Sequence, residues 1–145
     1  MKAAIDLTRY HARAQHGDIT AYLTWWLADD GGPRPCIVLI PTRMHERVQP
    51  CVVHIEQAWM WSEEIGDPER ACRLAFAFAA ALGLDVNNQM NVFRVRSIIV
   101  DHLGDLLTMP PMPDDMRESV VIGEAKVTNR EAGTVVRHEE ITDRV

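Results

Sequence analysis

The chain has 145 residues, the size of one ordinary domain, and its apolar (47%) and charged (25%) fractions are average for a globular protein. Its net charge of −6 at pH 7 argues against nonspecific binding to nucleic-acid phosphates, which requires clustered cations. The longest apolar run, residues 74–82, is far shorter than the ~20 residues that a membrane span needs.

The cysteines and the first residues indicate a reducing compartment. Cys36, Cys51 and Cys72 are an odd number, and each lies in or beside an apolar run, which is typical of reduced core residues. Residues 1–4 lead directly into Asp6 without the apolar region of a secretion signal. We therefore expect a cytoplasmic location.

The first third of the chain predicts four strands. Residues 3–13 are ambiguous between helix and strand, and Thr8 and Tyr10 favour a strand. Strict alternation predicts a strand over residues 19–27, and a buried strand follows at 36–40. A fourth strand is predicted for residues 48–55, where Pro50 indicates an edge position or a bulge.

A helix is predicted from Asp67 to Leu82. Asp67 is a favourable N-cap, Pro68 suits the first helical position, and Gly83 suits the residue after the C-cap. Because this segment is apolar on nearly every side, we expect it to be buried on nearly every side. Four large side chains would then contribute about 1.5–3 kcal/mol each: Leu74, Phe76, Phe78 and Leu82.

A second helix is predicted for residues 89–107, although the β-branched run at 98–100 would also suit a strand. Its core stripe would be Val92, Val95, Ile99, Leu103 and Leu106.

The element order predicts an α+β fold. Residues 119–128 and 133–141 form a predicted C-terminal β-hairpin, which gives the order ββββ-αα-ββ. The antiparallel sheet of four to six strands would pack against two central helices. Residues 1–145 would form a single domain, with a helical middle at 67–107 and the hairpin within 119–141.

Four tryptophans in two doublets suggest a binding surface. Trp25 shares its strand face with apolar residues, whereas Trp26 shares its face with Thr20, Tyr22 and Thr24. Trp, Met, Tyr and Arg are enriched at protein interfaces. We therefore expect a partner-binding face that comprises Tyr22, Trp26, Arg43, His45, Arg47 and Trp61. The alternatives are that the indoles cap the core and that residues 41–47 are a plain exposed loop.

Metal, cofactor and catalytic signatures are weak. Cys36, His45, Cys51 and His54 have the residue types of a zinc site, but in a strand Cys51 and His54 point to opposite faces. A Cys51–His54 nucleophile is possible by residue type. The cluster Asp101, His102 and Asp105 is interpreted as a solvated helix face. We predict no metal, no cofactor and no catalytic residue.

The sequence thus favours a non-enzymatic protein-interaction module. It would be a small acidic adaptor, subunit or inhibitor that occupies a partner's surface, and a phage or mobile-element origin would suit it. One alternative is a small enzyme or ligand-binding domain with a Trp-, His- and Arg-lined pocket between sheet and helices. Another is a homodimer or larger homo-oligomer paired through the C-terminal hairpin. Membrane and direct nucleic-acid partners are not expected.

Overall fold

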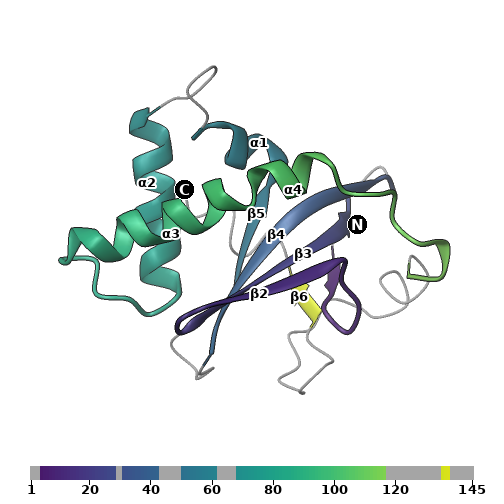
Figure 1. Cartoon of the computed structure of the whole chain (residues 1–145), viewed down its shortest axis with the longest axis horizontal. Coiled ribbons are helices and arrows are strands. Elements are labelled where there is room, and N and C mark those ends of the chain that lie inside the picture. Colours follow the sequence, from purple (N-terminus) through teal and green to yellow (C-terminus); the bar gives the residue numbers. More distant parts are fainter. Residues whose placement is uncertain (1–3, 29–30, 43–49, 62–67, 117–134, 138–145) are drawn as a thin grey trace.

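The computed structural model describes residues 4–28, 31–42, 50–61, 68–116 and 135–137. Figure 1 shows an antiparallel four-stranded sheet with helices on one face and a short two-stranded ribbon on the other. The chain therefore has an α+β fold built from an antiparallel sheet and helices.

The sheet has the order β2-β3-β4-β5, formed by Ala12–His16, Ile19–Leu27, Pro33–Pro41 and Cys51–His54. The predicted strand at 19–27 is confirmed, because its alternation is long and unbroken. β4 begins earlier than the predicted residue 36. Pro33 and Pro35 are tolerated there because β5 pairs only with residues 36–39, which leaves one edge of β4 without a described strand. The edge position inferred from Pro50 is confirmed for β5.

The predicted single strand over residues 3–13 is wrong. β1 (Ala4–Asp6) pairs with β6 (Val135–Arg137) in a separate ribbon, whereas β2 joins the edge of the main sheet. The chain must turn between them, because the ribbon lies over the sheet face and β2 lies in the sheet plane. A two-residue loop that begins at Gly17 then joins β2 to β3 in a hairpin. Gly17 has a φ of +64°, which glycine adopts without the strain that a side chain would cause.

The helices are α1 (Ile55–Trp59), α2 (Pro68–Ala81), α3 (Gln89–Asp101) and α4 (Leu103–Leu107). The start of α2 at Pro68 is confirmed, while Asp67 is outside the described residues. Its C-terminal end is a complete Schellman motif: Gly83 N donates to Ala80 O and Leu84 N donates to Ala79 O, both at 3.0 Å.

Two corrections concern the other helices. The segment predicted as one helix over 89–107 is helical but is divided at His102, which ends α3 and precedes α4. Residues 55–59 form the short helix α1, so β5 ends at His54 and not at residue 55. The side chain of Gln57 accepts a hydrogen bond from His54 N at 2.9 Å, which helps to start that helix.

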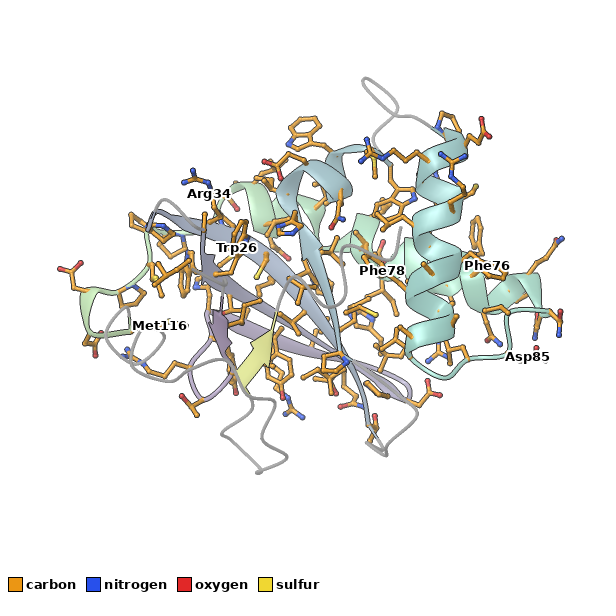
Figure 2. All side chains as sticks on the ribbon, turned by 180° about the vertical axis from the view of Figure 1, so that it is seen from behind. Trp26, Arg34, Phe76, Phe78, Asp85 and Met116 are labelled. Atoms are coloured by element: carbon orange, nitrogen blue, oxygen red, sulfur yellow. The ribbon has the colours of Figure 1, made fainter. Side chains whose placement is uncertain are left out.

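Both faces of the main sheet are covered. On one face, Cys51 Sγ donates to Phe78 O of α2 at 3.5 Å. On the opposite face, Val38 and Val52 are fully buried, and Thr24 Oγ1 donates to Arg9 O, just after β1, at 3.4 Å. Figure 2 shows β6 in front of this second face. Thr20 and Thr24 of β3 are buried on this face, which the sequence left open.

The composition of α2 predicted a helix buried on nearly every side, and this prediction is wrong. Phe78 is 1% exposed and faces the sheet, whereas Phe76 is 50% exposed and projects from the opposite side of α2 (Figure 2). Cys72 is also exposed and is not a core residue. The sheet covers one side of α2 and α3 packs against another, so part of its apolar surface stays open.

Of the predicted C-terminal hairpin, only residues 135–137 are described, and they pair with β1. None of the described helices has the length and apolar character needed to cross a bilayer.

Candidate functional site

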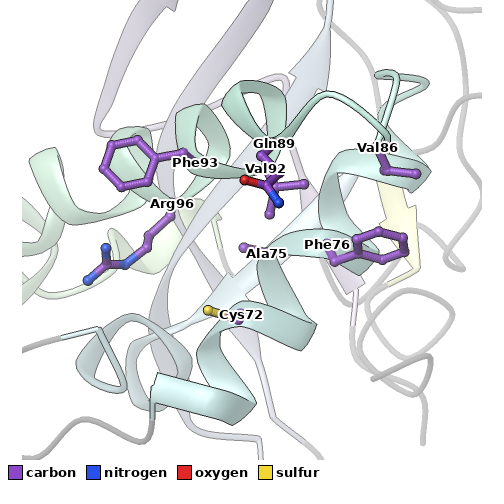
Figure 3. Close-up of a pocket in the computed structure, with 8 residues that line it drawn as sticks. All are labelled: Cys72, Ala75, Phe76, Val86, Gln89, Val92, Phe93 and Arg96. Carbon is purple, nitrogen blue, oxygen red and sulfur yellow. The ribbon is translucent and has the colours of Figure 1, made fainter.

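An open apolar groove lies between α2 and α3. Its volume is about 370 Å³, within the range of about 300–1,000 Å³ typical of ligand sites. Figure 3 shows Ala75 and Val92 between the helices, with Phe93 and Arg96 towards one side and Phe76 and Val86 towards the other. Cys72 and Gln89 complete the lining. We call this site the α2–α3 groove.

α3 carries a second apolar stripe beside the one that it buries. Its buried side is formed by Val95, Ile98 and Ile99, which pack in the core. Met90, Phe93 and Val100 recur at helical spacing on another side and are 69%, 56% and 39% exposed. This exposed stripe extends the apolar surface beyond the groove, over about 15 Å of helix at 1.5 Å per residue.

Arg96 is the one charged residue in the groove lining. Its guanidinium carbon lies 5.9 Å from the centre of the Phe93 ring, a cation–π arrangement. Other arginines have carboxylate partners: Arg73 pairs with Glu69 at 3.1 Å, and Arg94 pairs with Asp18. Among the described residues, none supplies a carboxylate to Arg96.

The cysteines differ sharply in accessibility. Cys36 and Cys51 are fully buried, and burial raises the pKa of the Cys36 thiol far above its ordinary value. Cys72 is exposed and lines the groove.

The proposed zinc residues are divided between the two sheet faces. Cys36 is the register partner of His54, whereas Cys51 faces α2. His45 lies outside the described residues. Within the described part of the chain, no three His, Cys, Asp or Glu residues are arranged to hold a metal ion.

A histidine pair lies where β2 meets the α3–α4 break. The Nε2 atoms of His16 and His102 are 2.7 Å apart, and the rings meet edge to face. Burial lowers the pKa of His16, and the nearby His102 lowers it further. Asp105 lies 3.8 Å from His102 Nδ1, too far for a hydrogen bond. The sequence singled out His102 but not His16, because their contact spans 86 positions.

The predicted partner-binding residues are brought together only in part. Tyr22 and Trp26 share a face of β3 but are half-buried, and each contacts an aromatic ring of its own chain. The Tyr22 ring lies 5.0 Å from that of Tyr10, and the Trp26 ring lies 4.7 Å from that of His54. Trp61, at 5% exposure, is buried in the core, which the sequence left open.

The remaining predicted residues, Arg43, His45 and Arg47, are outside the described residues. Phe76 was predicted to be buried, and Phe93 was not predicted as a surface residue. Because α2 is apolar along its length, its sequence does not show that Phe76 is on the uncovered side. Phe93 falls outside the predicted core stripe of α3, and that signal could have found it.

Comparison of the chain with protein-family models, with curated proteins and with solved structures found no match.

Proposed function

We propose that the chain is a non-enzymatic protein-interaction module that docks a partner protein through the α2–α3 groove. One observation carries the proposal: Phe76, Phe93 and Met90, which lie in the groove and the adjoining stripe, are 50%, 56% and 69% exposed. Contiguous exposed apolar surface of this kind is typical of interaction sites, where a few residues supply most of the binding energy.

The chemistry of the lining favours binding over catalysis. The polar groups that line the groove are the Arg96 guanidinium, the Gln89 amide and the Cys72 thiol. Nucleophilic catalysis by a thiol needs an adjacent base, and the lining contains no histidine or carboxylate. An enzyme or ligand-binding pocket between sheet and helices, the first alternative from the sequence, has less support than the groove between helices.

The finer expectations from the sequence belong to this proposal. They are an adaptor, subunit or inhibitor role, a cytoplasmic location and a C-terminal hairpin over residues 119–141. Pairing of two chains through that hairpin is the alternative, and light scattering of the purified protein tests it.

Affinity capture from an extract of the source organism tests the proposal with the wild type and two variants, and Trp26→Ala is captured in parallel. Phe93→Ser removes a groove aromatic, while Tyr10→Ser removes an aromatic of similar exposure (44%) on the other side of the sheet. We expect a protein that the wild type and Tyr10→Ser capture and Phe93→Ser loses, with circular dichroism unchanged. Capture of the same proteins by all three would exclude the groove. Loss in a Trp26→Ala protein alone would place the site on the strand face.

A further inference from the structure

We infer that the segment that fills the α2–α3 groove is an acidic amphipathic helix of about three turns. This inference rests on the proposed function and names the chemistry of the partner. The exposed stripe on α3 and the groove beside it share Phe93, and Arg96 is the one charged residue of the groove lining.

The shape of the surface favours a helix. The site is made by the sides of two helices, and side-chain ridges of a third helix pack into the grooves between such rows. The exposed stripe from Met90 to Val100 is about 15 Å long, which matches about three turns of a partner helix with apolar residues at i, i+3/i+4 and i+7. A partner strand would need an open sheet edge, and this surface is formed by helices.

The charge of the surface favours an acidic partner. The segment that forms α2, α3 and their connection, residues 68–101, contains four arginines and three acidic residues, a net charge of +1 in a chain whose net charge is −6. Arg96 lies inside the groove, and no described carboxylate pairs with it, whereas Arg73 and Arg94 are already paired. A carboxylate from the partner would meet a guanidinium held against Phe93, and complementary charge of this kind sets specificity and orientation.

Two other occupants fit less well. In a symmetric pair of this chain the same patch would face itself, so two positively charged surfaces would meet. A small apolar carboxylate would satisfy Arg96 within the 370 Å³ groove, but it would leave Met90 and Val100 uncovered on the adjoining stripe.

Selection from a display library of random 16-residue peptides tests the inference, because it needs no known partner. The full chain is the target, and clones that also bind Phe93→Ser are discarded. We expect groove-dependent peptides with apolar residues at helical spacing and an excess of Asp and Glu over Lys and Arg. Enrichment of basic or alternating, strand-like peptides would overturn the inference, as would a library without groove-dependent clones.

The best selected peptide is then measured against charge variants by fluorescence polarisation. Arg96→Glu should weaken its affinity about tenfold or more, since it replaces an attraction by a repulsion in a partly desolvated site. Arg13→Glu, a reversal at an exposed arginine of β2, is the matched control and should have little effect. Equal affinity for Arg96→Glu overturns the charge argument.

Competition with dodecanoate, a small apolar carboxylate, tests whether the groove binds a small ligand instead of a helix. Displacement of the peptide by dodecanoate at a comparable affinity, with loss in Arg96→Glu, would make the groove a lipid site and would overturn the inference. A failed peptide selection together with groove-dependent capture of a protein would overturn the acidic helix but leave the proposed function intact.

Discussion

The Nε2 atoms of His16 and His102 lie 2.7 Å apart in rings that meet edge to face, so one nitrogen must donate and the other accept. This hydrogen bond can form only while at least one of the two rings is neutral and its Nε2 carries no proton. It joins the edge strand β2 to the break between α3 and α4. Asp101, Asp105, Arg94 and Asp18 are the charged groups around it.

We predict that the free energy of unfolding falls as the pH drops below about 6.5. The pKa of His16 is lowered by burial and by His102, so below its ordinary value the unfolded chain binds more protons than the folded chain. The slope is at most about 1.4 kcal/mol per pH unit for one such group, and stability lost in this window returns above pH 6.5. His54, whose pKa burial also lowers, acts in the same direction.

Urea unfolding between pH 7.5 and 5 measures this slope. A His16→Gln protein should have a shallower slope than the wild type, and His54→Gln should remove a separate part of it. Asp18, whose pKa is lowered mainly by its hydrogen bond with Arg94, titrates below this window and provides the acidic reference. A wild-type stability that is flat from pH 7.5 to 5 would contradict the prediction.

Gly17→Ala should destabilise the protein more than Gly31→Ala. Both glycines have a positive φ, so each alanine introduces left-handed strain of about 1–2 kcal/mol. At Gly17 the new Cβ would also lie 2.8 Å from Arg94 Nη2, which donates to His16 O, whereas nothing lies within 4 Å at Gly31. Equal urea midpoints for the two variants would show that Arg94 moves aside without loss.

Phe78→Ala and Phe76→Ala should separate stability from binding. Phe78 is 1% exposed, and its truncation should cost about 3–5 kcal/mol. Phe76 is 50% exposed, so its truncation should lower the free energy of unfolding by about 1 kcal/mol or less. It should instead weaken binding of the partner protein. Thermal unfolding and partner capture, measured on the same preparations, check the effects on stability and on binding. A large loss of stability in Phe76→Ala would mean that the Phe76 ring belongs to the core.

One cysteine of three should react with a maleimide in the native protein. Cys72 is exposed in the groove, whereas Cys36 and Cys51 are buried and burial disfavours the Cys36 thiolate. Intact mass spectrometry should show one adduct, none in Cys72→Ser, and three after denaturation. A partner in the groove should slow labelling of the wild type.

The parts of the fold that local chemistry determines were predictable. β3 follows from nine alternating residues, and the end of α2 follows from Gly83 and Leu84. The pairing of β1 with β6 was not predictable, because it joins distant short segments whose pattern is too brief to define a register.

The sequence indicated that the chain has a protein-binding surface, but it did not indicate where that surface lies. Residue types that are enriched at interfaces pointed to Tyr22, Trp26 and Trp61, but burial depends on neighbours that the alternation does not reveal. Phe76 and Phe78 are two positions apart in one apolar run, and only the placement of α2 on the sheet makes one a core residue and the other a surface residue.

The β1–β6 pairing has a consequence for biosynthesis. It sets Ala4 against Arg137, so the ribbon can close only after the chain has been made as far as residue 137. Pairs so remote in sequence form slowly, because a long loop must close before the contact stabilises it. Until then the growing chain presents one sheet face without its ribbon, and transiently exposed apolar surface of this kind favours aggregation during synthesis.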